Sequence, residues 1–257
     1  MQDSLLEIAN DKVELFTEML NLQEEFYKRL YNKEILNEEF SFNDVWEFIK
    51  KIIFKTKDII VKVYYAITDY IRKQTGIQLT LGDGILFSEE RFNNSKILET
   101  YFISAVSKSR VLIADLRSML ESMIHNDLES AHTVRGKIFE DTSDLEKSFF
   151  ELKKVYDSSQ NRDYKYVNTI KTQAFRNEVN KRNENINKMY GDMLKEFTNI
   201  ENLSRKIKNV EGDTNINDVK VSVTQTSKLI LSMSEYAYRV LSFLNGSIMA
   251  GPNTTKL

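Results

Sequence analysis

Residues 43–75 read NDVWEFIKKIIFKTKDIIVKVYYAITDYIRKQT, and this stretch decides the fold class. Its apolar residues recur at alternating four- and three-residue intervals, which places them on one side of an α-helix. The main row is Val45, Ile49, Ile52, Thr56, Ile59, Val63, Ala66 and Tyr70, and Trp46, Ile53, Ile60, Tyr64, Ile67 and Ile71 widen it. Because apolar residues cover most of the circumference, we expect this helix at the centre of a bundle, ending near Gly76.

Proline and glycine are both scarce, with one proline and eight glycines among 257 residues. Long helices tolerate neither residue in their interiors. The sequence therefore predicts an all-α fold, an elongated helical bundle of five or six long amphipathic helices. We expect residues 1–246 to form a single bundle domain, with a candidate sub-boundary near 158–161, and residues 247–257 to form a C-terminal tail.

Apolar spacing and capping residues set the expected helices. They span about residues 3–37, 43–75, 89–130, 133–157 and 162–209, and a last helix ends at Asn245-Gly246. Ser88 is the expected N-cap of the third helix, in which Leu98, Phe102, Ala105, Ser109, Leu112, Leu116, Met119 and Met123 form the inward row. The segment Asn177 to Asn187 has few apolar residues, so we expect a kink or a protruding segment there.

Residues 76–87, GIQLTLGDGILF, interrupt the helical pattern with three glycines. Alternation at 77–81 and a Gly-Asp-Gly turn are compatible with a small β-hairpin at 77–87, and equally with an ordered loop. Glycines beside an acidic residue also occur in phosphate-binding loops. No Lys-Ser or Lys-Thr follows at the required spacing, so we do not predict phosphate binding.

The residues that could support catalysis are few. The chain has no cysteine, which excludes thiolate metal sites and thiol catalysis. Glu129 and His132 have the Glu-x-x-His spacing of di-iron bundles, His125 lies one heptad before His132, and Glu121 and Glu129 flank His125 at one helical turn. That pattern needs a second Glu-x-x-His, and the chain has only two histidines. We predict no metal, no cofactor and no enzymatic activity.

Charge is unevenly distributed along the chain. Residues 1–40 carry ten acidic and four basic side chains, a net charge of −6, whereas residues 161–210 carry eleven basic and six acidic, a net charge of +5. The candidate interaction surface consists of Lys181, Arg182, Lys188, Arg205, Lys206 and Lys208, with Tyr164, Tyr166 and Tyr190 near enough to stack on bases. The chain is slightly acidic overall and has no DNA-binding motif, so nucleic acid is a partner that we consider but do not favour.

No run of residues is apolar enough for a transmembrane helix, and the N-terminus lacks the pattern of a secretory signal peptide. The Lys-rich stretch 43–75 could lie on an acidic membrane, so a membrane-active helical protein of the pore-forming toxin type is the alternative function. Such proteins usually carry a near-continuous apolar hairpin, and the sequence shows none.

The run Trp46 to Lys55, WEFIKKIIFK, with its aromatic and Ile- and Lys-rich continuation, resembles helices in internal and structural virion proteins of large tailed bacteriophages. The likeness covers residues 42–75 and is one of composition. It implies a non-enzymatic structural protein that is made in a host cytoplasm, resides in the virion, and binds other copies of itself or other virion proteins. Such proteins are often trimmed after Leu-x-Glu, a pattern that Leu5-Leu6-Glu7 and Leu36-Asn37-Glu38 match.

Overall fold

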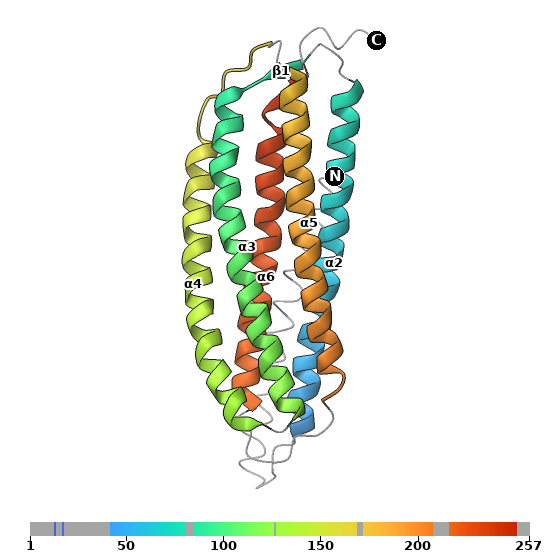
Figure 1. Cartoon of the computed structure of the whole chain (residues 1–257), viewed down its shortest axis with the longest axis vertical. Helices are drawn as coiled ribbons and strands as arrows, with labels where there is room; N and C mark the ends of the chain where they lie inside the picture. Colours follow the sequence, from blue (N-terminus) through green and yellow to red (C-terminus); the bar gives the residue numbers. More distant parts are fainter. Residues whose placement is uncertain are drawn as a thin grey trace.

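The computed structural model describes residues 13, 17, 42–80, 85–125, 127–168, 172–207 and 216–250. Its elements, in chain order, are α2 (Phe42–Thr80), β1 (Ile85–Phe87), α3 (Glu89–Ile124), α4 (Leu128–Gln160), α5 (Thr172–Ser204), α6 (Ile216–Asn245) and β2 (Ile248–Ala250). The five long helices lie side by side along one axis, with the small sheet at one end (Figure 1). The predicted all-α, elongated helical bundle is therefore confirmed.

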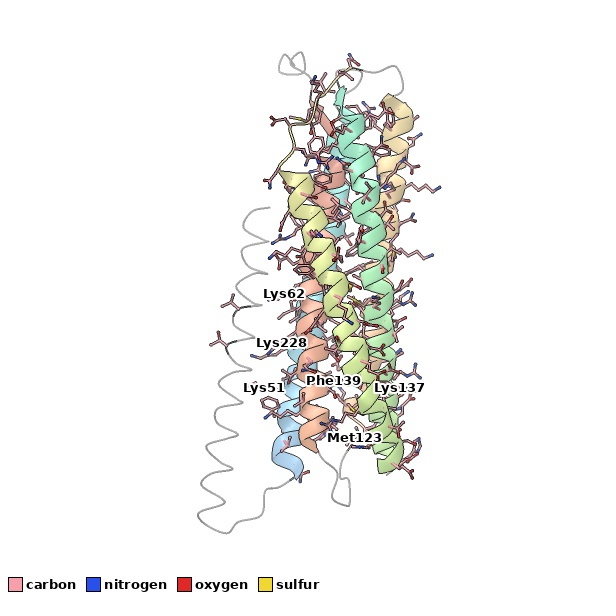
Figure 2. The ribbon with its side chains drawn as sticks, turned by 90° about the vertical axis from the view of Figure 1, so that its left-hand side faces the viewer. Lys51, Lys62, Met123, Lys137, Phe139 and Lys228 are labelled. Carbon is pink, nitrogen blue, oxygen red and sulfur yellow. The ribbon has the colours of Figure 1, made fainter. Side chains whose placement is uncertain are left out.

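Helix α6, and not α2, takes the central position among the described helices. It packs against α2, α3, α4 and α5, whereas α2 packs chiefly against α5 and α6. Figure 1 shows α6 behind α3 and α5, and Figure 2 shows it between α2 and α4. The apolar row of α2 is nevertheless inward as predicted, because Ile52, Ile59 and Val63 are all buried. Among the described helices, α2 therefore lies beside the central helix and is not itself the central helix that the sequence predicted.

One continuous hydrophobic core runs along the bundle. It takes residues from every described long helix, among them Trp46, Phe102, Leu145, Phe197 and Val240. The indole N–H of Trp46 donates a hydrogen bond to the carbonyl oxygen of Ile207, 3.1 Å away, so the largest core side chain is satisfied at its polar atom. This core includes residues on both sides of 158–161, where α4 ends in a turn.

The small sheet corrects two predictions. Ile85–Phe87 pairs antiparallel with Ile248–Ala250, with Leu86 opposite Met249, so no local hairpin forms at 77–87. Residues 77–80 belong to α2, which continues through Gly76 to Thr80. Gly76 does not stop the helix, because its position is open to solvent and an exposed helical glycine costs only about 1 kcal/mol. Residues 248–250 of the expected tail 247–257 form a strand that pairs with β1.

Helix ends follow the capping residues in several places. The Ser88 side chain accepts a hydrogen bond from the backbone N–H of Arg91, as predicted for the N-cap of α3. Asp127 caps α4 in the same way through Ser130 N, so α4 begins before the expected residue 133. Helix α6 ends at Asn245, as predicted. Gly246, however, does not adopt the left-handed backbone expected of a glycine stop.

The fifth helix begins later than predicted, and its polar segment is not a protrusion. Residues 162–168 are not helical, and α5 starts at Thr172. It then runs without interruption through 177–187. Val179, Arg182, Asn183 and Ile186 in this segment are buried, so the expected kink or protruding segment is not there.

Candidate functional site

The predicted basic surface does not form a single site. Lys181, Arg182 and Lys188 lie near the start of α5, whereas Arg205 and Lys206 follow its end. At 1.5 Å per residue, Arg182 and Arg205 are about 35 Å apart. Lys208 lies outside the described residues. The positive charge of this segment is therefore spread along the bundle.

Arg182 is not a surface residue, which corrects the sequence-based prediction. It is 4% exposed and forms an ion pair with Glu99 of α3. Its Nη1 also donates to the Ser95 hydroxyl at 3.0 Å, and its guanidinium carbon lies 5.2 Å from the centre of the Phe92 ring. Its Nη2 is buried without a hydrogen-bond partner among the described residues. Arg182 thus joins α5 to α3.

The Asn-rich segment of α5 meets polar partners on neighbouring helices. Asn183 and Asn245 are both buried, and each side-chain amide donates to the other's carbonyl oxygen, at 2.9 and 3.0 Å. Thr68 of α2 donates to Asn187 at 3.2 Å. The segment is polar because it builds buried hydrogen bonds between helices, which specify how the helices align. Of the predicted cluster at this end, only Lys181 and Lys188 face solvent.

The three tyrosines considered for base stacking are used inside the fold. Tyr190 is fully buried and hydrogen-bonds Ser234 of α6. Tyr164 donates to the carbonyl oxygen of Ser159 at 2.7 Å, and Tyr166 donates to that of Gly246 at 2.6 Å. These contacts fix residues 161–168 against the end of the bundle. They give these rings a structural role.

Arg91, which the sequence did not single out, organises this same end. Its Nε donates to the carbonyl oxygen of Phe243 at 3.1 Å, and its Nη1 donates to the Tyr166 hydroxyl at 3.2 Å. The guanidinium also lies 4.7 Å from the centre of the Phe243 ring. A Cβ on Gly246 would overlap the Arg91 guanidinium, which explains why glycine follows Asn245. In the sequence, the only indication of this role is that Arg91 stands one turn after the Ser88 cap.

At the C-terminal end of α5, the Glu201 carboxylate forms ion pairs with two basic side chains. Glu201 is buried and pairs with Lys57 of α2 at 2.9 Å and with Arg205 at 2.7 Å. Burial alone would raise the pKa of Glu201, but the hydrogen bonds from Arg205 and Lys57 outweigh it and lower that pKa. The Arg205 guanidinium also lies 4.4 Å from the centre of the Phe54 ring. The Arg205 side chain therefore takes part in the contact between α2 and α5.

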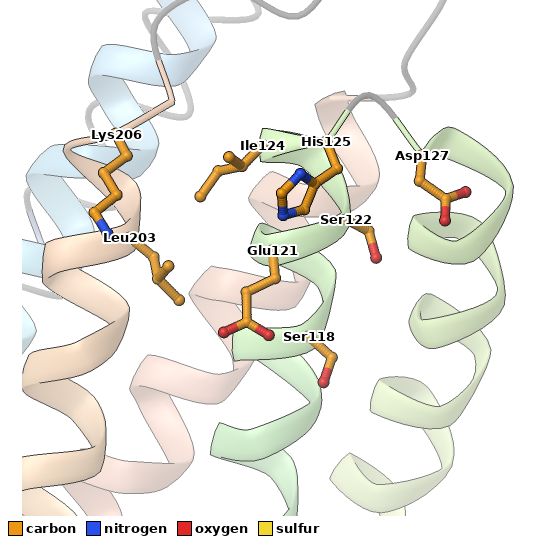
Figure 3. Close-up of a pocket in the computed structure, with 8 residues that line it drawn as sticks. All are labelled: Ser118, Glu121, Ser122, Ile124, His125, Asp127, Leu203 and Lys206. Carbon is orange, nitrogen blue, oxygen red and sulfur yellow. The ribbon is translucent and has the colours of Figure 1, made fainter.

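Lys206 lines a pocket of about 550 Å³ between α3 and α5. The remaining lining residues are Ser118, Glu121, Ser122, Ile124, His125, Asp127 and Leu203. Figure 3 shows His125 and Glu121 on the last turns of α3, facing Leu203 and Lys206 across the opening. Glu121 pairs with Arg117, and Asp127 caps α4, so two of its acidic groups already serve the fold. The pocket can admit a small polar molecule, but its described lining residues present no arrangement of nucleophile, base and oxyanion donors.

The two histidines do not lie on one helix. Helix α3 ends at Ile124, His125 is its C-cap, and His132 is exposed on α4. The expected continuation of α3 to about residue 130 is therefore wrong, and the Glu-x-x-His pattern is not aligned with Glu121. Within the described ranges, no group of three or more His, Asp or Glu side chains could hold a metal ion.

A carboxyl pair that the sequence did not indicate joins α3 to α4. Partial burial raises the pKa of Asp115 to about 6, assisted by its hydrogen bond with Asp141 and by the charge of that residue. Lys137 acts in the opposite direction. The pair can hold a shared proton at mildly acidic pH. Neither carboxylate lines the pocket of Figure 3, and we assign the pair to the helix contact.

None of the described helices is long and apolar enough to cross a membrane. Comparisons with protein-family models, with curated proteins and with solved structures found no match for this chain.

Proposed function

We propose that this chain is a non-enzymatic structural protein that works as one copy within a multi-subunit assembly, as a bacteriophage virion component does. We infer the assembly from a row of outward-facing residues on α3. Seven exposed residues recur there at alternating three- and four-residue intervals. They are Ile97, Thr100, Ser104, Ser107, Val111, Ala114 and Ser118, and we name them the α3 outer row.

The composition of this row is unusual for a solvated helix face. None of its seven residues is charged, and both Ile97 and Val111 are 50% exposed. Ile103, also exposed, flanks the row. The small residues in the row allow a second helix to approach closely, and the branched residues can fill the spaces on that helix. The row is therefore suited to contact with another helix.

The partner that we propose for the α3 outer row is the same row of a second copy. Most soluble homo-oligomers pair identical patches across a two-fold axis, which requires a self-complementary surface. The row meets that requirement around Val111, because two small residues lie on each side of it. With Val111 at the axis, Ser107 of one copy lies opposite Ala114 of the other. Ser104 then lies opposite Ser118, so small residues meet small residues.

The virion setting is the finer part of the proposal. It rests on the composition of residues 42–75, which resembles that of helices in bacteriophage structural proteins. The pairing of two copies rests on the α3 outer row alone, so the two parts can be tested separately.

Cysteine crosslinking tests this pairing cleanly, because the natural chain has no cysteine. Val111→Cys should form disulfide-linked dimers under mild oxidation, since the two-fold axis brings the two thiols together. The matched control is Val167→Cys in the segment between α4 and α5, because Val167 is 58% exposed and is the same residue type in another location. It should form no disulfide-linked dimer. Equal dimer yields from the two variants, or no dimer from Val111→Cys, would reject the α3 outer row as the contact between copies.

A further inference from the structure

A second exposed surface lies on the side of the bundle seen in Figure 2, where α6 is flanked by α2 and α4. Phe139 of α4, which is 69% exposed, Val221 and Lys228 of α6, and Lys51 of α2 all face solvent there. Figure 2 shows Lys51, Lys228 and Phe139 on this one side of the molecule. We name these four residues the α2–α6–α4 face.

Contacts between the helices show that these four residues lie at similar positions along the bundle axis. Phe149 stacks on Tyr236, and Tyr156 contacts Phe243, so each residue of α4 is level with the α6 residue 87 positions later. Phe139 is therefore level with residue 226. Lys220 lies over Phe48, and Tyr238 contacts Tyr70, which sets Lys51 level with about residue 222. At 1.5 Å per residue, the four residues span about 10 Å along the axis.

The chain itself supplies a segment that fits this face. Residues 1–41 precede α2 directly, and of these the structure describes Val13 and Thr17, both helical, with the Thr17 hydroxyl donating to the Val13 carbonyl oxygen at 2.9 Å. The sequence predicts an amphipathic helix at 3–37, whose apolar row is Leu6, Ala9, Val13, Phe16, Leu20, Tyr27 and Leu30, flanked by Leu15, Met19, Leu22 and Phe26. Val13 of the predicted row is 63% exposed, and Leu22 lies nine residues later, on the opposite side of a helix, so the docked side would be that of Leu22 and Phe26.

Charge favours docking of this segment. Residues 1–40 have a net charge of −6, whereas residues 41–75, which form most of α2, have a net charge of +3. Lys51, which is one of the basic residues of this stretch, and Lys228 of α6 place positive charge beside Phe139 and Val221. Opposite charges at the edge of an apolar contact fix its register and partner. A covalent link also raises the effective concentration of the segment far above that of a separate partner.

Length sets the expected register. If the segment turns back through residues 38–41, Glu24 lies about 20 Å along the bundle from the start of α2. Lys228 is level with about residue 58 of α2, which is about 24 Å from the same point. We propose that residues 3–37 fold back along the bundle and dock on the α2–α6–α4 face, with the Glu24 region beside Phe139 and Lys228. This docking occurs within one chain and does not depend on the assembly proposed above.

Paired cysteines in the full chain test the proposal. Glu24→Cys with Lys228→Cys should react with a short bismaleimide to give a crosslink within one chain, which migrates as a monomer. The control pair joins Glu24→Cys to Lys188→Cys, which is exposed on α5, away from this face. It should not crosslink. A crosslink only between chains, equal yields from both pairs, or no crosslink would overturn the docking.

Proteolysis gives a second, independent measurement. Phe16, Phe26 and Tyr27 are chymotrypsin sites, and docking should protect them. The double variant Lys51→Glu, Lys228→Glu should be cleaved in this segment several-fold faster than the wild type. The matched double variant Lys181→Glu, Lys188→Glu reverses two exposed charges on α5 and should be cleaved at the wild-type rate. Equal rates for all three proteins would contradict charge-assisted docking on this face.

Discussion

Arg182 of α5 and Glu99 of α3 form an ion pair in the interior of the bundle. Arg182 belongs to the most basic segment of the chain, yet its charge is used between two helices and not toward a partner. Ser95 and the Phe92 ring complete its surroundings. A buried pair of this kind is costly to break, because removing one charge leaves the other unpaired and desolvated.

Arg182→Met should therefore lower the free energy of unfolding by about 3–5 kcal/mol. The double variant Arg182→Met, Glu99→Gln should recover much of that loss, because no charge is then left unpaired. Lys188→Met, at an exposed position farther along α5, should change stability by less than about 0.5 kcal/mol. Denaturant unfolding measures all three, and equal midpoints for Arg182→Met and Lys188→Met would reject the buried pair.

The apolar row of α2 gives a second prediction. Ile59 is buried in the main core, so Ile59→Ala should cost about 2–5 kcal/mol through lost burial and the cavity left behind. Tyr65→Ala, on the exposed side of the same helix, is the control and should have a small effect. A denaturant midpoint unchanged by Ile59→Ala would contradict the inward placement of this row.

The packing of Gly246 against Arg91 gives a third prediction. A methyl group at residue 246 would displace the Arg91 guanidinium from the Phe243 carbonyl and from Tyr166. Gly246→Ala should therefore destabilise the protein by about 1–3 kcal/mol, the usual cost of overpacking. Gly76→Ala is the control, because nothing lies near its Cβ and alanine favours the helix. Thermal unfolding should show opposite shifts for the two variants, and a neutral Gly246→Ala would show that Arg91 can move without loss.

The carboxyl pair of Asp115 and Asp141 predicts a pH dependence. Because the folded-state pKa of Asp115 is raised to about 6, the protonated form is favoured in the fold. This stabilisation is fully present below pH 3.8 and is lost as the pH rises through about 6. After solvent screening we expect an effect of about 1–2 kcal/mol. Asp115→Asn should remove this contribution between pH 4 and 7, whereas Asp58→Asn, at an exposed position, should retain it. If the free energy of unfolding changes with pH equally in Asp115→Asn and in the wild type, this carboxyl pair is not the source of the pH dependence.

The sequence was sufficient where structure depends on local periodicity. The inward row of α3, from Leu98 to Met123, is buried as predicted, and Ser88 and Asn245 mark the helix ends that their residue types indicate. Apolar spacing defines the buried side of a helix, and a capping side chain acts on the next turn, so both signals lie within a few residues.

Features that depend on distant residues could not be predicted in this way. Strand β1 pairs with residues about 160 positions later, and no local pattern indicates that partner. The sequence alone does not distinguish a buried arginine from an exposed one. Arg182 is buried because Glu99 and Ser95 lie opposite it, on a helix about 80 residues earlier. The tyrosines of 161–168 likewise bind backbone carbonyls whose positions only the folded chain defines.

Sedimentation velocity of the purified full chain over a concentration series measures assembly through the α3 outer row. The wild type should associate as its concentration rises. Val111→Glu should remain monomeric, because the two-fold pairing would bring like charges together at the axis. Val167→Glu, at a similarly exposed position between α4 and α5, should associate as the wild type does. A wild type that stays monomeric at every concentration would reject assembly through the α3 outer row. So would two glutamate variants that are monomeric to the same degree.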